Sequence, residues 1–89
     1  MGPPDSFVPL APDLAVEVLS PSDRMTDALG KVGMYLDAGV RLVWLVDPSI
    51  NTVTIYRPGA APATLGEGDT LDGGEVLPDF RLPLAEIFA

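Results

Sequence analysis

Residues 14–23 read LAVEVLSPSD, and this stretch constrains the fold more than any other part of the chain. Residues 14–19 are mostly branched and apolar and too short for a stable helix, so they predict a largely buried strand. Glu17 places a carboxylate in the middle of that strand. A charge in a buried strand is costly unless a cation, a metal ion or hydrogen-bond donors compensate it. We therefore expect Glu17 to have a partner elsewhere in the chain.

A helix is expected to begin directly after this strand. Ser20, Pro21 and Asp23 have the form of a capping box with proline at the first helical position. The helix would run to about Ala38 and end at Gly39, because glycine commonly follows the last helical residue. Its apolar residues recur at helical spacing and form one stripe: Met25, Leu29, Val32 and Leu36.

The flank beside this stripe holds Lys31, which is the only lysine in the chain, together with Tyr35. Gly30 and Gly33 each weaken a helix by about 1 kcal/mol relative to alanine. Packing must therefore hold the helix, and we expect a neighbouring segment to come close at these glycines.

The remaining pattern predicts an α/β (α+β-like) fold with a small mixed β-sheet and one main helix. Residues 40–46 form a second apolar strand, and a helix between two strands implies a parallel pair. Residues 52–57 alternate with period two and predict a third strand. Loops are expected at 58–63 and 66–74, short extended pieces at 76–77 and 80–82, and a final helical turn at 84–88. All 89 residues are expected to form a single domain.

Composition narrows the chemistry that the chain can perform. It has no cysteine and no histidine, which leaves carboxylates as the metal ligands and favours hard ions such as magnesium, calcium or manganese. The net charge of −8 gives weak support to DNA as a partner, since nucleic-acid binding usually rests on a basic surface. No apolar run is long enough to span a bilayer, so we expect a cytoplasmic protein without a membrane partner.

Distance arithmetic restricts the carboxylates that could share a metal ion with Glu17. Asp13 lies four residues away on the same strand, roughly 13 Å at about 3.3 Å per residue, which is too far for one ion. A short strand at residues 5–8, paired antiparallel with residues 14–19, would instead bring Asp5 opposite Val16 or Glu17. Lys31 is then the candidate for orienting a metal-bound water.

The chain resembles the Uma-two family of restriction-endonuclease-like proteins from about residue 11 to its end. The resemblance is carried by PDLAVEVLSPSD at 12–23, Lys31, Tyr35, AGV at 38–40, VWLVDP at 43–48, VTIY at 53–56 and LPDFRLPL at 77–84. It implies the PD-(D/E)-x-K nuclease superfamily, in which a mixed sheet flanked by helices carries a magnesium site for DNA cleavage. It also implies that the N-terminal half of the family's domain is missing from this chain, leaving a truncated core.

The resemblance assigns roles residue by residue. Glu17 matches the metal-binding acid, and beside it we expect the carbonyl of Val18 to add a further ligand. The superfamily lysine is expected at position 19, where this chain has leucine, and Lys31 matches the helix position at which this family carries a lysine instead. The second metal-binding acid would be Asp5, with Asp13 as the fallback.

Other interpretations of these residues stay open. Glu17 can form a structural ion pair with Lys31 or an arginine, and Lys31 can be an ordinary surface lysine. Tyr35 and Trp44 are expected to be packing residues, and the acids from Glu67 to Glu75 are expected to face water. The whole chain can also be a catalytically inactive remnant that serves as an oligomerisation or partner-binding module, with a homodimer covering an exposed sheet edge.

Overall fold

The computed structural model describes residues 13–89, so Asp5 and the strand expected at residues 5–8 lie outside the described residues. The elements follow one another as β1 (Leu14–Val18), α1 (Met25–Asp37), β2 (Leu42–Asp47), β3 (Thr52–Tyr56), β4 (Ala63–Leu65), β5 (Thr70–Gly73), β6 (Leu77–Pro83) and α2 (Leu84–Ile87). Neither helix of this part of the chain has the length and apolar character needed to cross a bilayer.

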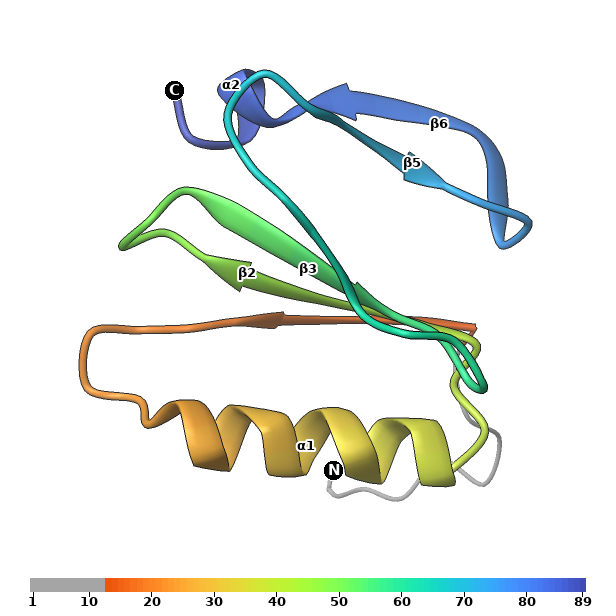
Figure 1. Ribbon diagram of the computed structural model, residues 1–89. Coiled ribbons are helices and arrows are strands. Elements are labelled where there is room, and N and C mark those ends of the chain that lie inside the picture. The colour runs from red at the N-terminus through yellow and green to blue at the C-terminus, as the bar shows by residue number, and fades with distance from the viewer. Residues whose placement is uncertain (1–12) are drawn as a thin grey trace, which may run out of the picture.

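The six strands form two sheets. A four-stranded sheet has the order β1-β2-β3-β4, and a separate hairpin pairs β5 with β6. β1 and β2 are parallel, as predicted for strands joined through a helix, and β3 and β4 continue antiparallel. Figure 1 shows three layers, with α1 on one face of the four-stranded sheet and the β5–β6 hairpin with α2 on the other.

The hydrophobic core divides between the two faces of the sheet. On the α1 side, Val32 packs against Val40 and Val43. The larger cluster lies on the side of β5, β6 and α2, and its buried members are Leu42, Trp44, Val53, Ile55, Leu71 and Leu84. Alternate residues of β2 supply both clusters, because successive side chains of a strand point to opposite faces. The four-stranded sheet is therefore the central layer to which both others attach.

Helix α1 begins later than predicted. Ser20 and Asp23 do make the expected contact, with the Ser20 N–H donating to Asp23 Oδ2 at 2.8 Å, but they close a turn that precedes the helix. Arg24 is the N-cap, without a side-chain hydrogen bond. The end of the helix is confirmed, since Gly39 follows it with a φ of 101° that favours glycine.

The buried stripe of α1 is rotated from the prediction. Ala28 and Val32 are the buried residues, while Met25 and Leu29 stay exposed. No neighbour among residues 13–89 approaches Gly30 or Gly33, because a Cβ built at either position meets none of their atoms within 4 Å. The helix therefore contacts the sheet along one side only.

The prediction that β1 is largely buried is wrong for one of its faces. Val16 and Val18 are 50% and 55% exposed, although they are apolar. β1 is an edge of the sheet, and in residues 13–89 β2 is its only paired neighbour. An edge strand has no neighbour on one side to cover its side chains, so the apolar pattern alone overstated its burial.

The C-terminal third is more regular than predicted. The loop expected at 58–63 contains the first residue of β4, the loop expected at 66–74 contains the whole of β5, and the two extended pieces belong to one strand, β6. Leu71 and Gly73 are buried, whereas the intervening Asp72 is partly exposed, so this segment is a strand rather than a solvated turn. The final helical turn is confirmed as α2, with Leu84 buried in the core.

Candidate functional site

Glu17 lies at the centre of the only side-chain network that joins β1 to α1 among the described residues. Its Oε2 accepts a hydrogen bond from Lys31 Nζ at 3.2 Å, and its Oε1 accepts one from the Tyr35 hydroxyl at 3.2 Å. The Glu17 side chain is 16% exposed and that of Lys31 is 52% exposed. The expected partner of the carboxylate is therefore present as a half-exposed lysine, with a tyrosine on the second oxygen.

The sequence produces this arrangement through two periodicities. Glu17 faces α1 because it shares the parity of Ala15, which packs on that side of the sheet. Lys31 and Tyr35 are four residues apart on α1, and residues at this spacing lie on the same face of a helix. One helix turn thus presents two donors to the two oxygens of one carboxylate.

The network shifts the protonation equilibria of both donors in the same direction. The hydrogen bond to Glu17 and the negative charge of that carboxylate raise the pKa of Lys31. Burial raises the pKa of Tyr35, and its hydrogen bond to Glu17 adds to the effect. Both groups therefore keep their protons at neutral pH and act as donors.

Backbone carbonyls of β1 add a second kind of oxygen to this edge. The N–H of Leu42 donates to the Asp13 carbonyl at 3.1 Å, and the N–H of Leu19 donates to the Val46 carbonyl at 2.9 Å. Odd-numbered residues of β1 therefore direct their backbone groups to β2, and by alternation the carbonyls of Val16 and Val18 point to the open edge. Among residues 13–89, the predicted ligand carbonyl of Val18 therefore accepts no hydrogen bond from a neighbouring strand.

A groove of about 590 Å³ lies where β1 and β2 end and α1 is about to begin. Asp23 and Asp47 line it, and both stabilise turns: Asp23 Oδ2 accepts the Ser20 N–H, and Asp47 Oδ1 accepts the Ser49 hydroxyl at 2.6 Å. The backbone N–H of Ser20 is also the main cause that lowers the pKa of Asp23. Ligands of α/β sheets commonly bind at the carboxyl ends of the strands, and Glu17 lies two residues from the groove residue Leu19.

The structure brings together only some of the predicted site residues. Glu17, Val18 and Lys31 meet at one edge, whereas Asp13 is exposed and lies 3.7 Å from Arg41 in an ion pair. Asp5 belongs to the residues outside the described part. Tyr35 was assigned to packing, although its spacing from Lys31 was a signal that it shares the same flank.

The described residues fit a hard divalent cation in part. Glu17 and the Val18 carbonyl are oxygen donors, which is the ligand type that magnesium and manganese prefer. Residues 13–89 nevertheless contain no group of three or more metal-binding side chains. A complete site would need further oxygens, such as a carboxylate from outside this range.

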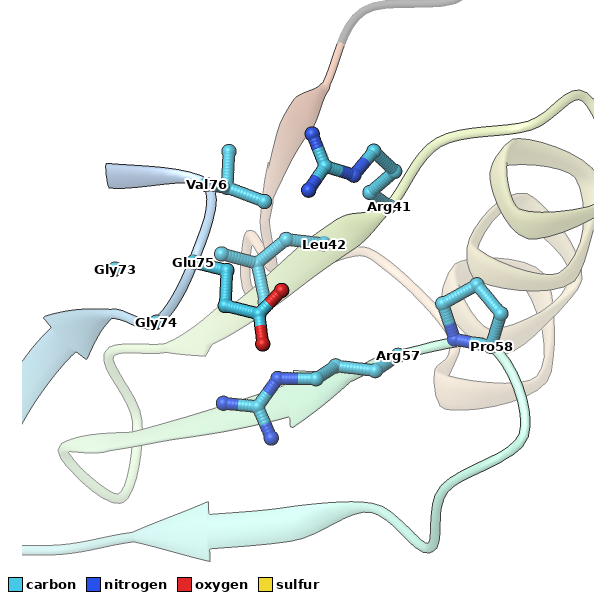
Figure 2. Close-up of a pocket in the computed structure, with 8 residues that line it drawn as sticks. All are labelled: Arg41, Leu42, Arg57, Pro58, Gly73, Gly74, Glu75 and Val76. Carbon is cyan, nitrogen blue, oxygen red and sulfur yellow. The ribbon is translucent and has the colours of Figure 1, made fainter. Parts of the chain in front are cut away.

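A second hollow of about 580 Å³ lies near the other end of the sheet, on the face away from α1 (Figure 2). Arg41, Arg57 and Glu75 line it over an apolar floor that includes Leu42. Glu17 is paired with Leu45 of β2, and Arg41 precedes Leu45 by four residues. At about 3.3 Å per residue, Arg41 is roughly 13 Å along the strand from the position of Glu17. Of the two guanidinium groups in the hollow, that of Arg41 is paired with Asp13, and Glu75 is the acid among the lining residues.

An apolar groove of about 580 Å³ follows the exposed face of β1. Val16 and Val18 form one wall, and Val46, Ile87 and Phe88 extend the apolar surface. This groove lies on the face opposite Glu17, because even-numbered and odd-numbered side chains of β1 point to opposite sides.

The chain is similar to a known protein family and to a solved structure. Residues 2–85 match the family model of Uma2, described as "Putative restriction endonuclease". The structure resembles that of a "putative nuclease belonging to DUF820" from Anabaena variabilis ATCC 29413, with 26% sequence identity and a TM-score of 0.81. The match covers 89% of this chain and 45% of that one, so the chain spans less than half the length of that protein. No curated protein matches the chain. The predicted Uma-two resemblance and the mixed α/β nuclease-like fold are both confirmed.

Proposed function

Because this chain belongs to the Uma2 family, we propose that it forms part of a metal-dependent nuclease that hydrolyses phosphodiester bonds in DNA in the cytoplasm. The observation that carries the proposal is the Glu17 carboxylate at the open edge of β1, held by Lys31 on one oxygen and Tyr35 on the other. A carboxylate and a lysine meeting at a strand edge are the groups that phosphodiester hydrolysis needs for holding a cation and orienting water.

Magnesium, or manganese in its place, would be held by Glu17, the Val18 carbonyl and Asp5. The ion would supply positive charge for the phosphate and lower the pKa of the attacking water. Asp13 is a weaker candidate for the second acid, because it is exposed and paired with Arg41.

Lys31 is suited to hold the attacking water. Its ammonium is half-exposed and protonated, so Nζ can donate a hydrogen bond to water beside the carboxylate. Its long side chain can reach this water without moving the helix, whereas Leu19, at the position where the superfamily carries lysine, has no donor. The role of Lys31 is orientation and charge stabilisation, because an ammonium that keeps its proton cannot act as a base.

The charge of the chain supports metal dependence. The chain contains five lysine and arginine residues and thirteen aspartate and glutamate residues. The groove beyond Leu19 is lined by Asp23 and Asp47. A phosphate approaching this surface is repelled unless a cation offsets the carboxylates. Cleavage should therefore require a divalent ion and not only be accelerated by one.

The direct test is cleavage of plasmid DNA with and without 10 mM magnesium or manganese, a concentration on the order of that needed to fill a weak carboxylate site. Wild type, Glu17→Gln, Lys31→Met and the control Glu86→Gln, which replaces an exposed glutamate of α2, are compared. Wild type and the control should cut, and the other two should lose at least about a hundredfold in rate. Equal activity in all four proteins would refute the proposal.

A second candidate function is that of a non-catalytic module that pairs with another copy of itself. The apolar groove along Val16 and Val18 favours it, because the backbone of β1 on the side away from β2, which pairs with no strand among residues 13–89, can form an antiparallel ladder with the same edge of a second chain. Sedimentation of wild type, Val18→Lys and the control Ile50→Lys tests this, since Ile50 is exposed outside the groove. A dimer that only Val18→Lys dissociates supports the module. A wild type that is monomeric at all concentrations removes it.

A further inference from the structure

The two oxygens of Glu17 are held by donors of different mobility. Tyr35 is partly buried and packs against the cluster of Val32, Val40 and Val43, and its own carbonyl accepts the N–H of Val40 at 3.0 Å. Lys31 is half-exposed and packs in neither core cluster. The tyrosine is thus fixed by its surroundings, whereas the lysine can exchange its partner at little cost.

The two oxygens of Glu17 therefore differ in how easily they can exchange their partners. Oε1 is bound by a neutral donor that cannot leave without unpacking the end of α1. Oε2 is bound by the charged Lys31 ammonium at 3.2 Å. A divalent ion that bound Oε2 would compete with this ammonium for the same oxygen.

We propose that Tyr35 is the positioning residue of the Glu17 site, holding Oε1 so that Oε2 is exchanged between Lys31 and a divalent cation. This inference rests on the proposed function for the cation, but the positioning of Glu17 by Tyr35 exists without it. Release of Lys31 from Oε2 on cation entry also frees Nζ at the moment when it is needed for the attacking water. Tyr35 itself touches neither cation nor substrate and acts through Glu17.

Two variants separate the roles of the donors, and the chain provides a matched control. Tyr35→Phe removes one hydroxyl and keeps the packed ring. Tyr56→Phe makes the same change at the other tyrosine, which also packs on the α1 side but donates no hydrogen bond to Glu17. Lys31→Met removes the competing charge and keeps a side chain of similar length.

The first measurement needs no metal. Three-bond couplings of the Glu17 β-methylene protons report whether its side chain occupies one rotamer or several. Wild type, Lys31→Met and Tyr56→Phe should show one rotamer, and Tyr35→Phe should show averaging. A single rotamer in Tyr35→Phe overturns the inference, whether or not the protein binds metal.

The second measurement is the affinity for manganese, followed by the loss of the free-ion electron paramagnetic resonance signal. Tyr35→Phe should bind about tenfold more weakly, as is typical when a group that orients a metal ligand is removed. Lys31→Met should bind more tightly than wild type, and Tyr56→Phe should be unchanged. Unchanged affinity in Tyr35→Phe would overturn the positioning role in the metal-bound site. Absence of manganese binding to wild type would refute the metal-dependent function and leave the rotamer measurement to decide the role of Tyr35.

Discussion

Leu84 offers a quantitative test of the layered architecture. It is the first residue of α2, is 1% exposed, and packs beneath β2 and β3 in the larger core cluster. Its backbone N–H donates to the Asp69 carbonyl at 3.0 Å, a bond that alanine would preserve. Leu84→Ala therefore removes only the buried side chain, and such a change costs about 3 kcal/mol when transfer and cavity terms are added. The whole domain has a stability of about 4–13 kcal/mol at this length, so the variant loses a large fraction of it.

The assay is urea unfolding followed by the fluorescence of Trp44, the only tryptophan of the chain. Leu77→Ala is the matched control, because it deletes the same atoms from a leucine of β6 that is 38% exposed, and it should cost about 1 kcal/mol. The midpoint of thermal unfolding should fall by about 12–24 °C for Leu84→Ala. Equal losses in the two variants, or a loss below about 1 kcal/mol in Leu84→Ala, would refute the assignment of α2 and the hairpin to a packed layer.

Three further predictions use the same unfolding assay. Gly30→Ala should stabilise the protein by about 1 kcal/mol, because the added Cβ meets no atom of residues 13–89 within 4 Å and alanine favours the helix; a loss of stability would show that something covers this face. Gly73→Ala should destabilise by about 1–3 kcal/mol, because the Cβ would overlap the side chain and carbonyl of Leu77, and wild-type stability would contradict that close approach. The N–H of Ser20 lowers the pKa of Asp23 below 3.8, so this carboxylate stabilises the fold above that pH and the contribution is lost as pH falls through the lowered value. Asp23→Asn should flatten the acid limb of the stability profile, and an unchanged limb would argue against the bond.

The central crossover could be predicted from the sequence because each of its parts carries its own local signal. Two short apolar runs separated by a helix-length segment imply a parallel pair, and β1 and β2 are parallel. The start of α1 was misplaced because the Asp23 carboxylate accepts the Ser20 N–H in this turn as it would in a capping box, although the Ser20 hydroxyl contacts Ser22 instead of the Asp23 N–H. β5 was missed because its glycines and acids are typical of loops, and only its pairing with β6 makes it a strand. The two strands are joined by a short turn, but neither shows the alternation of apolar and polar residues that marks a strand in the sequence.

The candidate site was predictable to a similar extent. A lone carboxylate in an apolar strand signalled a partner, and Lys31 is that partner. Tyr35 was assigned to packing, and it does pack, but its hydroxyl also reaches Glu17. An aromatic residue four positions from a site lysine lies on the same helix flank, so the hydrogen bond could have been predicted from the sequence. The hollow at Arg41, Arg57 and Glu75 had no such signal, because three distant segments form it.

Within residues 13–89, the edge of β1 that faces away from β2 links the two candidate functions, because both use the same backbone atoms. The Val18 carbonyl that would hold a cation points to the edge that a second copy would need for its strand ladder. A backbone carbonyl paired with a neighbouring strand has its preferred hydrogen-bond direction occupied and is a poorer metal ligand. Self-pairing through this edge would therefore weaken cation binding at Glu17, and cation binding would in turn weaken self-pairing by the same factor, since linkage between two sites is reciprocal. The two functions are thus coupled through one strand edge, and they compete for it instead of adding to one another.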